Sequence, residues 1–299
     1  MSTRLRPTPA LVLFLRILLL PALFSMLSLP GGSACAQAPA GGSKSMWSFL
    51  TEGDFDPVLE GSYGYGIFSH NLYTADLPAN ATISLKLGFR EVKNYKSWGK
   101  KLDERFLIGT YGKSSIPPGK EGSGGTAGEW WRVGTGQRSG YGWELGNQAL
   151  IPYHQYSFGI TEPTFTPGAG LTPGDSAILL RTAGDWRLGM STEGGVDVEL
   201  FSSIAASAGY EMSVIYPRVV FPKWIGSYLI ASSSIILVSN FAEEIVKTSP
   251  FFGPILYFIL KNGVAYAFFY AFRGDMNWPF PSETPMMVQT LKLNVSIRF

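Results

Sequence analysis

The sequence contains one cysteine, Cys35, and only two histidines, His70 and His154. A single thiol cannot build a disulfide framework or a multi-thiolate metal site within the chain. Charged residues make up 15% of the 299 residues, and the formal net charge is +2. This composition lacks the basic surface of a nucleic-acid-binding protein and the high charge of a disordered one. We therefore expect no nucleic-acid partner and no cofactor.

Catalytic motifs are also scarce. Gly112-Lys113-Ser114 ends like a phosphate-binding loop, but Leu107 stands where that loop requires its first glycine. The pair Gly134-x-Gly136 is not followed by the helix of a dinucleotide site and instead predicts a glycine-rich hairpin. Neither histidine has a Glu-x-x-His or cysteine partner, so the sequence predicts no metal site.

The N-terminus has the features of a secretory signal peptide. Arg4 and Arg6 precede a leucine-rich run, and the small residues of Ala34–Ala38 offer cleavage sites. We expect residues 1–38 to be removed and residues 39–57, rich in Gly, Ser and Pro, to form a flexible periplasmic lead-in. The alternatives are an uncleaved anchor and a lipoprotein acylated at Cys35.

Short segments of alternating polarity follow the lead-in. Because successive side chains of a strand point to opposite faces, each segment predicts a strand with one apolar and one polar face. Tyr, Trp and Phe crowd the apolar phase, which suits a bilayer interface better than a soluble sandwich. The longest uninterrupted example runs from Ala177 to Ser191. The ten segments cover residues 59–67, 83–90, 105–111, 131–134, 141–146, 155–160, 177–191, 196–200, 210–216 and 291–299.

The last nine residues alternate without a break, from Leu291 to the terminal Phe299. This ending resembles the C-terminal signal of bacterial outer-membrane β-barrels. The resemblance implies that the barrel-assembly machinery recognises Leu293, Val295, Ile297 and Phe299 and that outer-membrane lipid surrounds the folded chain. We expect an all-β transmembrane antiparallel β-barrel of about ten strands, with eight to twelve compatible, as one domain over residues 58–299.

Residues 222–272 break the alternation. Apolar residues spaced by three and four predict a helix that Pro222 begins, and the run from Phe251 to Phe272 reads as a second helix or as a strand. Charged residues such as Lys261 make this stretch marginal for spanning a membrane. We expect a mainly helical insert on the outer side that plugs the lumen or caps one mouth, with two inner-membrane helices as the alternative.

The polar phase carries charges of both signs, so ion pairs inside the barrel can offset the cost of burying them. Five members of the candidate lumen cluster, from Arg181 to Glu211, lie on consecutive predicted strands, and Arg132 lies on an earlier one. The insert glutamates Glu243 and Glu244 are expected to meet the arginines of the cluster and so hold the plug. The cluster comprises Arg132, Arg181, Asp185, Arg187, Glu199 and Glu211.

The expected function is non-enzymatic: a structural, assembly or passage role in the bacterial outer membrane, reached through a cleaved signal peptide. The apolar insert leaves room for a hydrophobic ligand. One alternative is a lipid-modifying enzyme that uses His70 or His154, although the His-x-Ser-Asn pattern of outer-membrane lipid A deacylases is absent. The other is an inner-membrane-anchored protein with a periplasmic β-domain.

Overall fold

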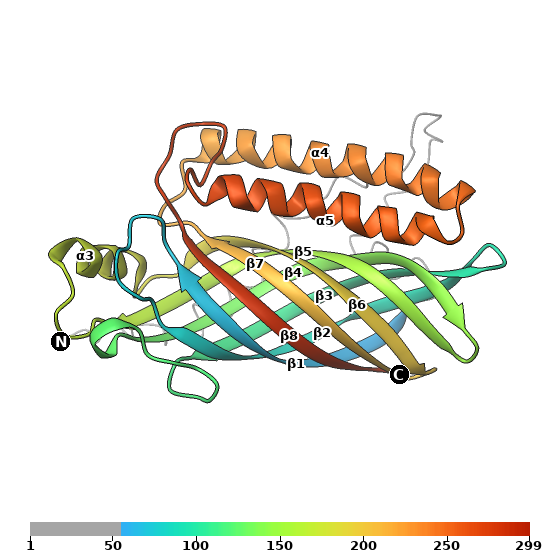
Figure 1. The fold of residues 1–299 in the computed structure, drawn as a ribbon, viewed down its shortest axis with the longest axis horizontal. Coiled ribbons are helices and arrows are strands. Elements are labelled where there is room, and N and C mark those ends of the chain that lie inside the picture. Colours follow the sequence, from blue (N-terminus) through green and yellow to red (C-terminus); the bar gives the residue numbers. More distant parts are fainter. Residues whose placement is uncertain (1–54) are drawn as a thin grey trace, which may run out of the picture. The chain divides into compact units, whose positions relative to one another are not determined.

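The computed structural model describes residues 55–299, which form a closed barrel of eight antiparallel strands (Figure 1). The expected signal peptide and nearly all of the lead-in lie outside the described residues, and the last two lead-in residues already belong to β1. The strands are β1 (Asp56–Ser69), β2 (Ala79–Tyr95), β3 (Gly99–Lys113), β4 (Ala127–Leu145), β5 (Gln148–Thr166), β6 (Arg187–Phe201), β7 (Ile204–Ile215) and β8 (Met286–Arg298).

Each strand pairs with the next along the chain, and β8 closes the barrel on β1 with Val58 opposite Arg298. The barrel therefore has two different ends. At the turn end, where β1 begins and β8 finishes, connections of two or three residues join β2 to β3, β4 to β5 and β6 to β7. At the loop end lie the four longer connections, including residues 216–285 between β7 and β8.

Strand β8 confirms the expected division into two faces. Thr290, Lys292, Asn294 and Ser296 are buried in the lumen, while Leu291, Leu293, Val295 and Ile297 are 42–66% exposed on the outer wall. The terminal Phe299 is exposed, and its backbone N–H donates to the carbonyl of Pro57. The apolar phase of the last strand thus faces outward.

The barrel has eight strands rather than about ten because two pairs of predicted segments merge. The segments at residues 131–134 and 141–146 belong to one continuous strand, β4, so the expected glycine-rich hairpin between them is wrong. Glycine is needed there because inward-facing positions of β4 have little room: a Cβ on Gly136 would lie 2.6 Å from the ring of Phe106. The end of the segment at 177–191 and the segment at 196–200 both lie in β6.

The first part of the segment at 177–191 is a helix, α3 (Pro173–Thr182), and not a strand. Thr172 caps this helix by accepting a hydrogen bond from the N–H of Asp175, and Pro173 occupies the first turn, where a missing N–H costs nothing. These local start signals outweigh the alternation that follows them.

Helix α3 covers the loop end of the lumen. Its Leu179 is fully buried in an apolar cluster with inward-facing residues of the strands, among them Phe68, Trp130 and Phe165. The carboxylate of Asp175 ties the helix to the β1–β2 loop by accepting from the N–H and hydroxyl of Thr74. The cap of one mouth is therefore α3, a segment that sequence reasoning assigned to the wall.

Residues 222–272 do form helices, as expected, but they do not plug the lumen. Helices α4 (Phe221–Thr248) and α5 (Phe252–Phe272) make an antiparallel hairpin on the outer side of the wall, with α5 against β4 to β7 (Figure 1). The hairpin leaves the barrel at the loop end, and its tip reaches the turn end, where Trp143 donates to the carbonyl of Pro250. The lumen has no space for it because strand side chains already fill the interior.

Removing the Asp175 carboxylate should loosen α3. The hydrogen bonds from Thr74 and Thr172 hold the pKa of this carboxylate below its ordinary value of 3.8, so the anchor is intact at neutral pH and is lost as the pH falls through the lowered pKa. We expect Asp175→Asn to speed protease cleavage within residues 167–186 at pH 7, measured by mass spectrometry of the fragments. Equal cleavage rates for Asp175→Asn and the partly exposed control Ser176→Ala would contradict this anchoring role.

Candidate functional site

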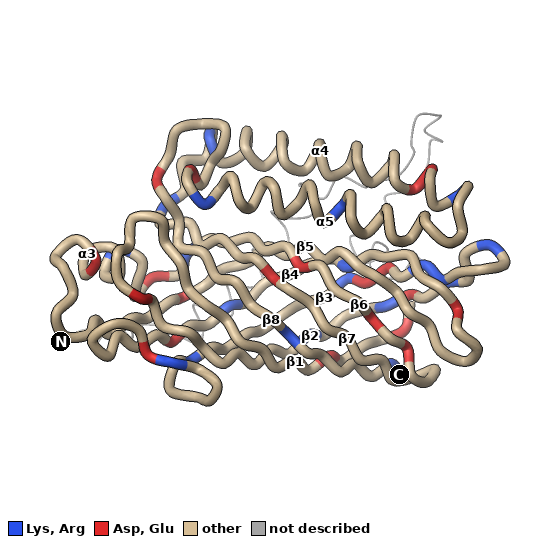
Figure 2. Tube along the Cα trace, in the orientation of Figure 1, with Lys and Arg blue, Asp and Glu red and all other residues tan. Residues whose placement is uncertain are grey.

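The lumen contains ten buried charged side chains, and their signs balance. Five are acidic and five are basic, they come from every strand except β5, and none of the ten is more than 6% exposed. Figure 2 shows charged residues of both signs along the strands of the barrel. Because charges removed from water require partners, equal numbers of the two signs can neutralise one another inside the wall. The ten are Glu60, Glu104, Glu193, Asp197 and Glu211 with Lys86, Arg90, Arg132, Arg138 and Lys292.

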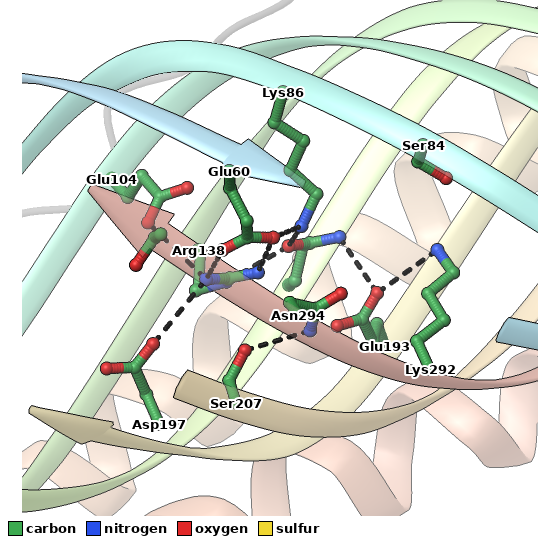
Figure 3. Close-up of polar contacts among 12 residues, drawn as sticks. Glu60, Ser84, Lys86, Glu104, Arg138, Glu193, Asp197, Ser207, Lys292 and Asn294 are labelled. Atoms are coloured by element: carbon green, nitrogen blue, oxygen red, sulfur yellow. Dashed lines mark hydrogen bonds and ion pairs between the residues drawn. The ribbon is translucent and has the colours of Figure 1, made fainter. Parts of the chain in front are cut away.

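Arg138 is the centre of one half of this lumen network (Figure 3). Its two terminal nitrogens bind both oxygens of Glu60, at 2.7 and 2.9 Å, and its Nε donates to Gln155. The guanidinium also stacks 4.5 Å from the ring centre of Tyr153. This paired geometry fixes the guanidinium plane as well as its charge. Lys86, Arg90, Glu104 and Asp197 complete the half, with nitrogen–oxygen distances of 2.6–3.7 Å.

Lys292 is the centre of the other half. Its ammonium lies 2.5 Å from a Glu211 oxygen and 3.4 Å from Glu193. Arg132 binds the second oxygen of Glu211 at 2.8 Å. Gln155 joins the halves, because its amide oxygen accepts from Lys86 and its amide nitrogen donates to Glu193. The ten charges are thus linked across the barrel.

Apolar side chains border the network on both sides. Toward the loop end lies the cluster under α3, and toward the turn end Leu102, Ala149 and Ile151 fill the interior with at most 2% exposure. The charges therefore lie between two apolar layers that separate them from solvent at either mouth. A lumen packed in this way is a core and not a wide aqueous path.

The structure brings together only part of the predicted cluster. Two of its members, Arg132 and Glu211, lie in the lumen and form an ion pair at 2.8 Å. Glu199 lies at the turn-end mouth, where it pairs with Arg298 at 3.0 Å. Arg181, Asp185 and Arg187 are outside the lumen: Arg181 pairs with Glu283, and Arg187 with Asp185, at the loop end. Arg181 was misassigned because residues 173–182 are helical, and Asp185 lies in the connection that follows the helix. Arg187 is the first residue of β6, and its guanidinium binds backbone carbonyls at the mouth instead of lumen carboxylates.

The alternation in the sequence also places four other network members, Glu60, Lys86, Arg90 and Lys292, on the inward phase. Sequence reasoning missed the remaining four: Glu104, Arg138, Glu193 and Asp197. Glu104 and Arg138 lie in stretches read as unclear or as a hairpin, while Glu193 lies at the boundary of two predicted segments. A usable signal was present, because Arg132 and Arg138 are separated by an even number of residues and so share a face if β4 is continuous.

A second polar site lies on the outer wall, where α5 covers it. The ammonium of Lys261 donates to the hydroxyls of Ser139, at 2.9 Å, and Tyr257, at 2.8 Å, and lies 5.0 Å from the Tyr257 ring centre. We use the word seam for the interface between α5 and four residues of the wall: Ser139, His154, Gly194 and Tyr210. Lys261, which interrupts the apolar run of the insert, is therefore a seam residue that satisfies polar groups of the wall.

His154 and Tyr266 complete the seam. Asn262 Oδ1 lies 3.0 Å from His154 Nδ1, and the amide nitrogen of Asn262 donates elsewhere, so His154 Nδ1 is the donor. The hydroxyl of Tyr266 accepts from the N–H of Gly194 on β6 and donates to the carbonyl of Tyr210 on β7, its register partner. The helix thus bonds directly to two neighbouring strands.

The insert glutamates do not meet the predicted arginines. Glu244 pairs with Lys247 one helical turn away, and Glu243 lies within electrostatic reach of Lys101 at the turn end. The expected pinning of a plug is therefore wrong, because both residues lie near the hairpin tip, outside the barrel.

The two histidines lie far apart in the fold, so they do not form a common site. His154 is buried in the seam, whereas His70 lies in the β1–β2 loop at the loop end. Burial lowers the pKa of His70, and the nearby Arg181 cation lowers it further, so this imidazole is neutral at pH 7. Neither environment supplies a serine or carboxylate in hydrogen-bond contact with the imidazole among the bonds of the described residues.

Both helices of the hairpin are long and apolar enough to cross a membrane by length and composition. Helix α4 has 28 residues and α5 has 21, which correspond to about 42 and 32 Å. Leu237 and Phe241 of α4 and Ile259 of α5 are 54–70% exposed on the surface turned away from the seam. The hairpin is thus polar toward the wall and apolar on its free side.

Comparison of the sequence with models of known families and with curated proteins gave no match. Among solved structures, the fold is similar to the crystal structure of Neisserial surface protein A, with a TM-score of 0.41 and 10% sequence identity. The alignment covers 81% of this chain and 97% of that protein.

Replacing Arg138 with glutamine should destabilise the barrel strongly. The change leaves Glu60 buried without its two-point partner, and breaking one partner of a buried ion pair costs about 3–5 kcal/mol. The measurement is urea unfolding in lipid vesicles, followed by tryptophan fluorescence. Lys113→Gln is the control, since its pair with Glu129 is solvent-exposed and contributes little to stability. Equal midpoints for the two variants would refute the role of the network.

Replacing Gly194 with alanine should separate α5 from the wall. A Cβ there would lie 2.6 Å from Asn262 Oδ1 and 2.9 Å from the Tyr266 hydroxyl, and such overpacking costs about 1–3 kcal/mol. We expect faster cleavage near the hairpin tip by added protease. The matched control is Gly61→Ala, an outer-wall glycine with no atom within 4 Å of its added Cβ. If both variants resist protease like the parent, the seam does not hold the hairpin.

Proposed function

We propose that this chain is a bacterial outer-membrane protein whose filled barrel acts as a scaffold for a helical hairpin embedded in the same bilayer. Its role is structural or in assembly. This proposal rests on the different polarity of the two sides of the hairpin. Lys261, Asn262 and Tyr266 form hydrogen bonds with the wall, while the opposite side exposes large apolar residues.

The outer wall supports a membrane setting. Strands β1, β2 and β8, which α5 does not contact, expose an apolar belt that includes Leu85, Leu87, Leu291 and Leu293 at 52–66% exposure. Exposed apolar area of this extent is costly in water but suits hydrocarbon. Because β1 begins and β8 finishes at the turn end, that end would face the periplasm and the loop end the outer leaflet.

Passage of solutes is the least supported of the expected roles, because the lumen network and the two apolar layers occupy the interior. The exposed alternation of β8, including Leu293, Val295, Ile297 and Phe299, supports recognition by the barrel-assembly machinery during insertion. A hydrophobic ligand would find its apolar surface on the free side of the hairpin and not inside the barrel.

The depth of α4 tests this proposal. In a Cys35→Ala background, a fluorescent label on Leu237→Cys should be quenched by lipids that carry bromine on their acyl chains, because this residue of α4 is 70% exposed on the free side. Leu180→Cys on α3, 63% exposed at the loop end, is the matched control and should be quenched only from water.

Fractionation of the same cells provides the second readout. The full chain should be recovered with the outer membrane and should migrate differently on a gel before and after boiling. Recovery with the inner membrane, or quenching of the Leu237 label by aqueous iodide alone, would overturn the proposed function and favour an inner-membrane or soluble alternative.

A further inference from the structure

The loop end next to the root of the hairpin has an excess of positive charge. Three segments meet there, residues 181–187, 216–223 and 273–285, and together they contain five cationic and three acidic side chains. The cations are Arg181, Arg187, Arg218, Lys223 and Arg273, and the carboxylates are Asp185, Asp275 and Glu283. This region therefore has a net charge of +2 that its own residues do not neutralise.

Two of these arginines share one carboxylate. Arg181 lies 2.5 Å from one oxygen of Glu283, and Arg218 lies 2.7 Å from the other. Both guanidiniums remain open to a ligand, since their side chains are 60% and 63% exposed. Arg187 differs because it is 20% exposed and donates to the backbone carbonyls of Arg181 and Pro217, which fixes the segments beside each other. Two exposed guanidiniums thus lie close together, on the two oxygens of one carboxylate.

The turn end provides a contrast. It too is rich in lysine, but four of its five ammonium groups have a carboxylate within 3.5 Å, and the fifth, that of Lys96, donates to the backbone carbonyl of Lys247. The pairs are Lys93–Glu91, Lys100–Glu144, Lys101–Asp103 and Lys247–Glu244. Unneutralised positive charge beside the hairpin is therefore a property of the loop end, where the proposed function places the outer leaflet.

Apolar surface begins directly beside the charge. Arg218 is followed by Val219 and, at the start of α4, by Phe221, which are 45% and 63% exposed. Exposed Leu229 and Leu237 continue this surface along α4. A molecule with an anionic head and long apolar chains would match both parts, since its head would meet the arginines and its chains would lie along the helix.

We propose that Arg181 and Arg218 bind a phosphate group of a phosphorylated membrane lipid whose acyl chains lie along the free side of α4. Guanidinium is suited to this ligand because its planar donors match phosphate oxygens and form charge-assisted hydrogen bonds. This site rests on the proposed function for its source of lipid. Glu283 competes with the phosphate for the same donors and so limits the affinity.

The test is binding of fluorescent lipid A, a bisphosphorylated and multiply acylated disaccharide, to the purified full chain in neutral detergent micelles. We expect the double variant Arg181→Gln/Arg218→Gln to bind roughly tenfold more weakly or worse. The matched control is Lys113→Gln/Lys120→Gln, which removes two solvent-accessible positive charges at the loop end away from the hairpin and should bind like the parent. Parental affinity in the arginine variant, or an equal loss in the lysine control, would overturn the site.

A second variant and two further binding measurements test the proposal even if the arginine variant folds poorly. Glu283→Gln removes the competing carboxylate and should tighten binding of lipid A, so unchanged or weaker binding would count against the proposal. Dephosphorylated lipid A should bind the parent weakly, and inorganic phosphate equimolar with lipid A should not displace it. Displacement by inorganic phosphate would show that the acyl chains contribute nothing and would overturn the choice of a lipid.

The site and the proposed function can fail separately. Binding in micelles requires the folded chain but no particular membrane, whereas fractionation and the Leu237 label report on location alone. Recovery with the inner membrane together with arginine-dependent binding would refute the location and leave the phosphate site standing. Recovery with the outer membrane without arginine-dependent binding would refute the phosphate site and leave the proposed location standing.

Discussion

The structure depends on one electrostatic constraint: ten charges lie inside a closed wall and must satisfy one another there. Five carboxylates and five cations form ion pairs there, with Arg138 and Lys292 as the two centres and Gln155 between them, and Asp197 is held by ion pairs at 3.4 and 3.7 Å without a hydrogen bond. In a low-dielectric interior each pair interacts strongly, but an unpaired member would be very costly. The network therefore favours one register of the eight strands, since shifting a strand by one residue would move its charges to the outer face.

The same need for polar partners explains why the outer wall has two kinds of surface. Where β1, β2 and β8 are bare, the wall is apolar, and where α5 covers it, the wall includes Ser139, His154 and an approachable backbone at Gly194. Polar groups of the covered wall would be unsatisfied in hydrocarbon, so the hydroxyls and amides of α5 take the place of water. The hairpin is thus part of the wall's hydrogen bonding as well as a neighbour of it.

Sequence reasoning predicted the barrel, its inward and outward phases at β1, β2 and β8, and the helical nature of the insert, because these follow from local periodicity. The prediction failed where a local pattern was compatible with two structures. The alternation at 177–191 concealed the start of α3 at Thr172–Pro173, and the glycines of β4 looked like a turn although they make room for Phe106. The partners of Arg138 and the outer position of the hairpin could not be read from the sequence, because closure of the barrel brings together residues distant in the chain.

The register of β7 and β8 shows where the segment that carries the hairpin leaves and rejoins the barrel. Ile215 and Met286 are opposite each other in the β7–β8 ladder, so the excursion over residues 216–285 starts and ends at a single point of the barrel. A short reverse turn could join these two residues without altering strand order or shear. The hairpin is therefore an insertion between two strands that are already paired. If it was acquired by an eight-stranded barrel without it, the strands needed no rearrangement, and only the wall positions under the hairpin had to become polar.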